Sequence, residues 1–225
     1  MRTIPPVGRL CSIAIISASL FGCDTAAVLA PPPPLRAASA SNFAIDVEFA
    51  ESLDKLSAQD ASHYQVYSSG GGSPAIVLQA QLIDSLYGRV VRLYLQDPVL
   101  GSLADSAIYT VQTSDVISLA GKSTGRRSIE IRTGLNYTTP MRDLLAQRCN
   151  SCHGPARADG LYRTDSYSAL FDPGTSPTPN VIAGDPRCLL VVKTEPSNSM
   201  FRLGGLTFLD SEIIRNWVVS YLARE

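Results

Sequence analysis

The chain has 225 residues, of which 45 % are hydrophobic and 17 % are charged. This length suits one or two domains, and the apolar share is sufficient for their cores. The formal net charge is -1, so no nucleic-acid partner is predicted.

The first 22 residues are typical of an export signal peptide. Arg2 and Arg9 supply positive charge, and residues 10–20 form an apolar run that is too short to span a bilayer. The run ends in Leu20-Phe21-Gly22-Cys23, which resembles the lipobox of bacterial lipoproteins. The resemblance implies acylation of Cys23 and a lipid anchor on the periplasmic side of a bacterial membrane or at the cell surface. Cleavage after Val28-Leu29-Ala30, which would give a soluble periplasmic protein, is the alternative.

Residues 23–41 are predicted to be a linker that follows the lipid. They contain Pro31 to Pro34, followed mainly by alanine and serine. Consecutive prolines favour an extended polyproline II conformation, so the segment would lift the folded part off the membrane.

Residues 42–135 have the pattern of β-strands. Apolar and other residues alternate over 43–49, as expected of a half-buried strand, and further short β-forming runs follow. The spacing predicts about six or seven antiparallel strands in a sandwich. His63 is predicted to be a structural or surface residue. The region resembles bacterial Ig-like domains, which implies a spacer or contact module. The residues that carry this resemblance lie at 45–49, 61–66, 91–95, 107–111 and 119–122.

The most specific motif is Cys149-Asn150-Ser151-Cys152-His153. Cys-x-x-Cys-His is the attachment signature of c-type haem, in which two thiols form thioethers and the histidine binds the iron. Residues three or four apart share a helix face, so both thiols can reach one porphyrin edge. The sequence therefore predicts one covalent haem c, held by Cys149 and Cys152, with His153 as an iron ligand.

Three other kinds of site can contain a Cys-x-x-Cys pair. A zinc site would usually need a second pair of Cys or His ligands. A thioredoxin-like redox pair would need a βαβ setting. A structural disulfide is a further possibility in an exported chain. The later Cys188 is expected to be a small buried residue.

Residues 136–225 are predicted to be helical around this motif. One helix is expected to begin at Pro140, and another after Asp210 has an amphipathic pattern over 213–222. The order of these parts resembles class I cytochrome c domains, which implies an all-α fold. The matching residues are Cys149, Cys152, His153, Gly154, Gly184-Asp185-Pro186, Leu189-Leu190, Met200, Leu206, Glu212-Ile213 and Trp217.

Met200 is predicted to be the second iron ligand. Met141 precedes the motif on the same helix, whereas Met200 follows it in a later loop, from which a side chain can return to the opposite haem face. The alternative is a packed core methionine, with His63, a lysine or water on the iron. Four arginines are expected either to flank the haem propionates or to be solvated. They are Arg148, Arg157, Arg163 and Arg202.

The predicted organisation is multidomain. A signal peptide (1–22) and a lipid-anchored linker (23–41) precede an all-β Ig-like sandwich (42–135) and an all-α monohaem class I cytochrome c domain (136–225). The predicted function is a membrane-anchored c-type cytochrome that carries single electrons between unidentified redox proteins, without enzymatic activity of its own. The alternatives are a haem-bearing subunit of a larger membrane oxidoreductase or respiratory complex, and an Ig-like interaction protein with an accessory haem.

Overall fold

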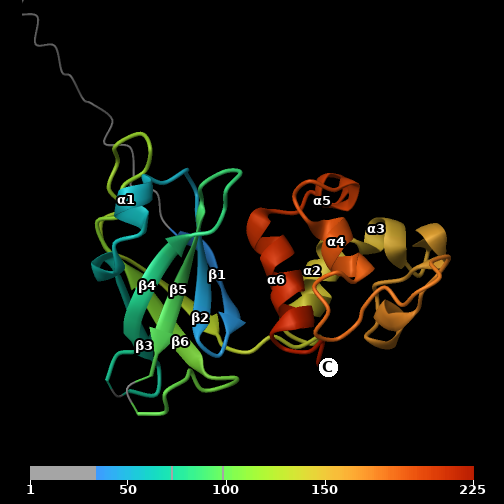
Figure 1. Cartoon of the computed structure of the whole chain (residues 1–225), viewed down its shortest axis with the longest axis horizontal. Helices are drawn as coiled ribbons and strands as arrows, with labels where there is room; N and C mark the ends of the chain where they lie inside the picture. Colours follow the sequence, from blue (N-terminus) through green and yellow to red (C-terminus); the bar gives the residue numbers. More distant parts are fainter. Residues whose placement is uncertain (1–33, 72, 98) are drawn as a thin grey trace, which may run out of the picture. The chain divides into compact units, whose positions relative to one another are not determined.

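The structure is a computed structural model that describes residues 34–71, 73–97 and 99–225 (Figure 1). The predicted signal peptide (1–22), the predicted lipid anchor at Cys23 and the linker up to residue 33 lie outside the described residues. Within the described part, no helix is long and apolar enough to cross a membrane.

Two antiparallel sheets form the N-terminal half. One has the strand order β1-β2-β5-β4, and the other has the order β3-β6-β7. A single-turn helix α1 (Lys55–Ala58) and a 3-10 helix η1 (Ala61–His63) connect β2 to β3. The strands are β1 (Pro34–Ser41), β2 (Ala44–Phe49), β3 (Tyr64–Ser68), β4 (Ile76–Leu82), β5 (Val90–Gln96), β6 (Ile108–Thr113) and β7 (Arg127–Arg132).

Strand β1 lies where the sequence predicted the end of a free linker. Ala37 pairs with Val47 and Ala38 with Asp46 of β2. The side chains of Ala38, Ser39 and Ala40 are buried. These small side chains allow close approach of helix α6 (Phe208–Val219), which contacts β1. The prediction of a linker that extends to residue 41 is therefore wrong, because tertiary packing gives these residues strand pairing.

Strand β2 is buried on both faces, although its sequence alternates. Ile45, Val47 and Phe49 belong to the core between the sheets. On the opposite face, Asp46 and Glu48 are only 1 % and 7 % exposed. Arginine side chains and residues of α6 cover this face, so the strand is not the half-buried strand that the alternation predicts.

The edges of the two sheets meet. Strand β1 contacts β7 on one side. On the other side, Val66 of β3 forms a bridge with Ala75, the residue immediately before β4. Each edge strand of one sheet therefore lies close to an edge strand of the other sheet, which leaves less of its edge open.

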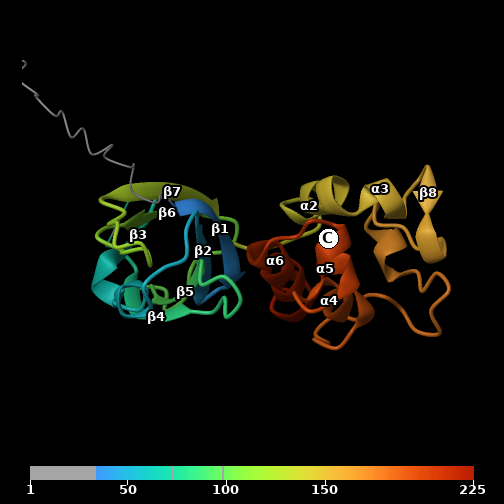
Figure 2. The same ribbon diagram turned by 90° about the horizontal axis from the view of Figure 1, so that it is seen from above.

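The C-terminal half consists of short helices and turns. The segments are α2 (Met141–Arg148), α3 (Asn150–His153), β8 (Arg157–Ala158), η2 (Asp159–Leu161), η3 (Ser168–Phe171), α4 (Leu189–Thr194), α5 (Ser199–Leu203) and α6. Figure 2 shows β8 beside α3, and backbone bridges join His153 to Ala158 and Gly154 to Arg157.

Helix α6 begins with a capping box. The Thr207 side chain accepts a hydrogen bond from the backbone N–H of Asp210, and the Asp210 carboxylate accepts one from the backbone N–H of Thr207. This arrangement satisfies donors that a helix N-terminus leaves unpaired. Asp210, after which the sequence predicted the helix to begin, is therefore the third helical residue.

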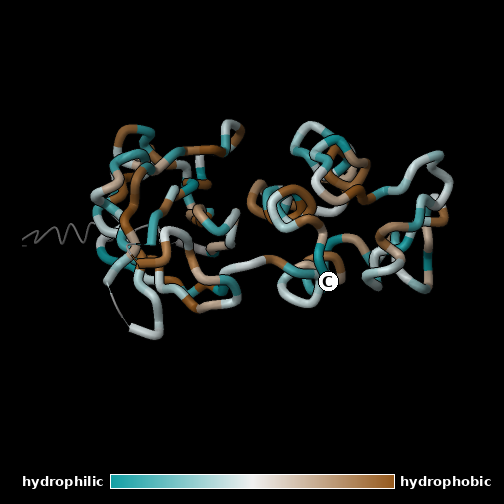
Figure 3. The backbone as a smooth tube through the Cα atoms, turned by 60° about the horizontal axis from the view of Figure 1, so that its bottom comes forward, coloured by the Kyte–Doolittle hydropathy of each residue, from teal (hydrophilic) through white to brown (hydrophobic). Residues whose placement is uncertain are grey.

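The hydrophobic core of the C-terminal half continues into the sheet. Trp217 and Leu145 are fully buried there, together with Ala38 of β1 and Val90 of β5. Figure 3 shows hydrophobic stretches separated by more polar ones along the described chain. The described residues from Pro34 onward accordingly belong to one compact unit.

The prediction of an Ig-like sandwich followed by an all-α class I cytochrome c domain is wrong as a fold class. The structure is sandwich-like, with described helices of four to twelve residues. Strand β8 and the 3-10 helices η2 and η3 interrupt the helical part. The physical reason is the shared core, because Ala38 and Val90 are buried among the residues of the helices.

Candidate cofactor pocket

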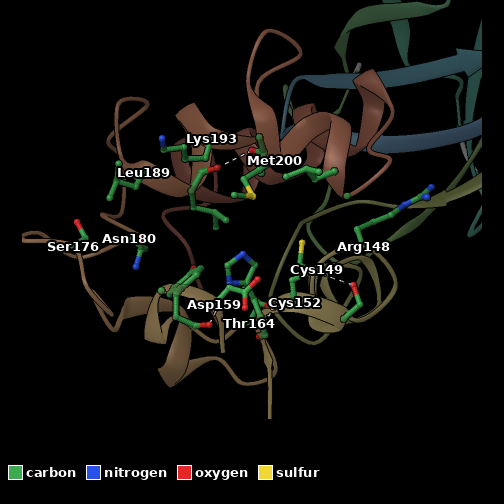
Figure 4. Close-up of a pocket in the computed structure, with 18 of the residues that line it drawn as sticks. Arg148, Cys149, Cys152, Asp159, Thr164, Ser176, Asn180, Leu189, Lys193 and Met200 are labelled. Atoms are coloured by element: carbon green, nitrogen blue, oxygen red, sulfur yellow. Dashed lines mark hydrogen bonds between the residues drawn. The ribbon is translucent and has the colours of Figure 1, made fainter. Parts of the chain in front are cut away.

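A pocket of about 540 Å³ lies between α3 and the α4–α5 segment (Figure 4). This volume lies within the roughly 300–1,000 Å³ that small-molecule and cofactor sites occupy. The lining residues are Arg148, Cys149, Ser151, Cys152, His153, Arg157, Asp159, Gly160, Tyr162, Thr164, Pro173, Thr175, Ser176, Asn180, Leu189, Leu190, Lys193, Thr194, Met200, Leu203, Gly204 and Leu206.

One helical turn presents both cysteines and the histidine to this pocket. The backbone N–H of His153 donates to the carbonyl of Cys149 at 2.8 Å, and that of Cys152 donates to the same oxygen at 3.1 Å. Gly154 ends the turn, and a Cβ at this position would overlap the carbonyl oxygen of Asn150. Only glycine therefore allows the chain to leave the motif along this path.

The orientation of His153 follows from its neighbours. Its Nδ1 lies 3.3 Å from the carbonyl oxygen of Tyr162. A carbonyl can only accept, so this contact requires the proton on Nδ1 and leaves the lone pair on Nε2. The backbone N–H of Thr164 donates to the His153 carbonyl at 2.7 Å, and the Thr164 hydroxyl donates to Asn150 Oδ1 at 2.7 Å. The imidazole is thus held in the tautomer that a metal-ligating histidine needs.

The opposite wall contains Met200, which is 37 % exposed. Figure 4 shows Met200 on the α4–α5 side of the pocket and Cys149 on the side of the Cys149–His153 turn. Asn198 donates through Nδ2 to the carbonyl of Val192 at 2.7 Å and so connects the end of α4 with the start of α5. Leu190 and Leu206 are buried, line the same pocket and contribute apolar surface to it.

The two motif cysteines are free thiols and partly buried. Burial raises the pKa of Cys149 to about 11, the charge of Asp210 adds to the rise, and Arg148 opposes it. The Cys149 thiol is therefore protonated at neutral pH and is a poor metal ligand in that form. Cys188 is buried beside the start of α4, as the sequence predicted.

The arginines of the sequence analysis fall into two groups. Arg148 and Arg157 line the pocket, whereas Arg163 and Arg202 do not belong to its lining. Arg157 forms an exposed ion pair with Asp159 at 2.7 Å. Arg148 reaches inward, and its Nε lies 3.4 Å from Oδ2 of the fully buried Asp210.

Sequence reasoning missed several residues of this site. Tyr162 and Thr164 orient His153, but no sequence pattern marks them, because they are ordinary loop residues that contact His153 through backbone groups. Asp210 was expected only to precede the last helix, although the capping-box spacing from Thr207 was present in the sequence. His63, which was predicted to be a structural or surface residue, does not line the pocket. Its Nδ1 is 3.0 Å from the carbonyl oxygen of Ser57 in the sandwich half.

The comparisons with known proteins give no family for this chain. No protein-family model matches the sequence, and no curated protein matches it. Similar solved structures include the S-layer protein rSbsC(31-844), at 20 % identity and a TM-score of 0.39, covering 47 % of this chain and 14 % of that chain. CopC from Methylosinus trichosporium OB3b has 17 % identity and a TM-score of 0.30, and the match covers 47 % of this chain and 97 % of CopC. A chain of the archaellum periplasmic stator complex of FlaF and FlaG from Sulfolobus acidocaldarius has 14 % identity and a TM-score of 0.26. The match covers 54 % of this chain and 100 % of that chain.

The assignment to class I c-type cytochromes preceded by an Ig-like domain is overturned, and so is the predicted role as a membrane-anchored electron carrier. The structures reported above are S-layer, CopC and archaellum stator proteins, not cytochromes c. Over residues 34–225, apart from positions 72 and 98, no group of three or more His, Cys, Asp or Glu side chains could hold a metal ion. Two of these structures are a surface-layer protein and a periplasmic stator complex.

Proposed function

We propose that the pocket binds one haem covalently, through thioether bonds from Cys149 and Cys152. The observation that carries the proposal is the donor set on one pocket of about 540 Å³: two free thiols, an oriented imidazole and a thioether. One histidine and one methionine suffice as axial ligands of haem iron, so such a site needs no cluster of acidic, histidine or cysteine side chains.

The residues of the pocket have distinct roles in this proposal. His153 would bind the iron through Nε2, since Nδ1–H faces the carbonyl of Tyr162. Met200 would offer its sulfur from the α5 side. Leu190 and Leu206 would exclude water from the ring faces. When bound, haem supplies an iron that can change its oxidation state. A redox protein as partner follows only from this cofactor, and the lack of enzymatic activity of the chain itself remains a prediction.

The test is the intact mass of the exported protein, produced in a bacterium that attaches haem to Cys-x-x-Cys-His motifs. We expect the mass of the chain plus one haem, and Cys149→Ser together with Cys152→Ser should remove the added mass. Cys188→Ser is the matched control and should retain it. Met200→Ala should also retain covalent haem, but with a changed visible spectrum. A wild-type protein without the added mass would show that the proposed function is wrong.

We also propose that the exported chain is anchored by lipid at Cys23. The support is the lipobox-like Leu20-Phe21-Gly22-Cys23 after the apolar run. Mass spectrometry of the mature N-terminus should show acylated Cys23, and Cys23→Ala should release the protein from membranes or block its maturation. A mature N-terminus beyond Ala30 would contradict the anchor and favour cleavage by ordinary signal peptidase.

A further inference from the structure

A chain of charged contacts leads from the sandwich to the wall of the pocket. Arg36 of β1 donates from Nη1 to Oδ1 of Asp210 at 2.7 Å. The same guanidinium donates to the Thr207 hydroxyl at 2.7 Å and to the Glu48 carboxylate at 3.0 Å. Arg36 thus joins two strands of the sheet to the first turn of α6.

Asp210 is the centre of this network, and its side chain is fully buried. A buried carboxylate is costly unless it is paired and hydrogen-bonded. Among the described residues, it forms ion pairs with two arginines, Arg36 at 2.7 Å and Arg148 at 3.4 Å. Arg36 makes the shorter contact, so Arg148 contributes less than Arg36 to stabilising the buried charge of Asp210.

Arg148 is the residue through which the network reaches the pocket. It is the last residue of α2, it directly precedes Cys149, and it lines the pocket. Its carbonyl oxygen also lies against Gly204, which follows α5 on the opposite wall. A change in the position of Arg148 would therefore be transmitted to the turn that presents both cysteines.

We propose that Arg36 is a positioning residue for the cofactor pocket, acting through the buried Asp210 on Arg148. With Arg36 present, Asp210 is compensated and Arg148 stays in the pocket wall. Without Arg36, Arg148 becomes the main cation for a buried charge and is drawn toward it, which displaces the start of the Cys149–His153 turn. The identity of the group in the pocket rests on the proposed function, whereas the positioning of the wall does not.

The test is hydrogen–deuterium exchange of the peptides that cover residues 148–154, in the full chain and its variants. Arg36→Met should increase their exchange rate by roughly tenfold or more, because a buried charge loses its principal partner. Arg36→Lys keeps the charge but has no fork to bridge Asp210, Thr207 and Glu48, so it should give a smaller increase. If Arg36→Met does not fold, Arg36→Lys alone tests whether Arg36 positions the pocket wall.

The matched control is Arg224→Met. Arg224 also joins the C-terminal half to the sandwich half, through Asp105 at 2.8 Å, but it does not touch Asp210. Its loss should leave exchange at 148–154 unchanged. In an Arg148→Met background, Arg36→Lys should cause no further increase, because both substitutions act on one network.

The outcomes separate the two proposals. Equal exchange at 148–154 in Arg36→Lys and Arg224→Met, or a full additional effect of Arg36→Lys in the Arg148→Met background, would overturn the positioning role. In haem-loaded protein, Arg36→Lys should in addition shift the midpoint potential, and Arg224→Met should not. A wild-type chain without haem overturns the proposed function, while the exchange measurement still decides the role of Arg36.

Discussion

Residues 136–225 produced alone are expected not to form a stable pocket. Removing the sandwich leaves Asp210 without Arg36 and Glu212 of α6 without Arg92, which donates to it at 2.8 Å. The loss of these ion pairs weakens the first turn of α6, and a typical domain has only about 5–15 kcal/mol of stability. The fragment also loses Ala38, Val90 and Leu135 from the core that surrounds Trp217.

This expectation can be checked by thermal unfolding followed by circular dichroism. The fragment 136–225 should show no cooperative transition, whereas residues 31–225, which contain the whole compact unit, should unfold cooperatively. Haem attachment provides a second measurement, since the fragment should carry little or none. A cooperative transition of 136–225 with full haem attachment would show that the C-terminal half is an independent domain, as the boundary predicted at 135/136 implies.

Trp217→Ala is expected to cost about 3–5 kcal/mol of unfolding free energy. Trp217 is fully buried on α6 and belongs to the core that joins the helices to the sheet. The substitution leaves a cavity, and it also removes the hydrogen bond from Nε1 to the carbonyl of Arg224 at 2.8 Å. Trp217→Phe keeps most of the ring volume and should cost less.

Denaturant unfolding of the full chain would measure both variants. Arg215→Ala is the matched control, because Arg215 lies on the same helix and is exposed. Its free energy of unfolding should change by less than about 0.5 kcal/mol. If Trp217→Ala changed stability as little as Arg215→Ala does, the core on the inner side of α6 would be looser than the structure shows.

Local patterns in the sequence predicted the local features of the fold. The alternating residues of β2 do form a strand, and the amphipathic residues 213–222 lie largely within α6. The fold class was mispredicted because it depends on contacts between distant segments. Ala38 and its neighbours have no strong strand preference, and the pairing of β1 becomes visible only when β2 and α6 are in place.

The candidate site divides in the same physical way. Cys149, Cys152 and His153 could be predicted because one helical turn fixes their spacing. Met200 could be predicted because it follows the motif in a later segment, and all four residues line the pocket. The supporting contacts could not be found in this manner. Arg36 and Asp210 are distant in sequence, and no periodicity connects an arginine near the start of the sheet to a carboxylate in a late helix.

The closed edges of the sandwich bear on how copies of the protein behave when they are crowded on a surface. An open edge strand offers a row of N–H and C=O groups on which a second chain can add a strand. Here β1 lies against β7, and the bridge from Val66 to Ala75 joins the other pair of edges. These contacts leave a second chain less space to add a strand at either edge, so we expect neighbouring molecules at high local density to meet mainly through side chains.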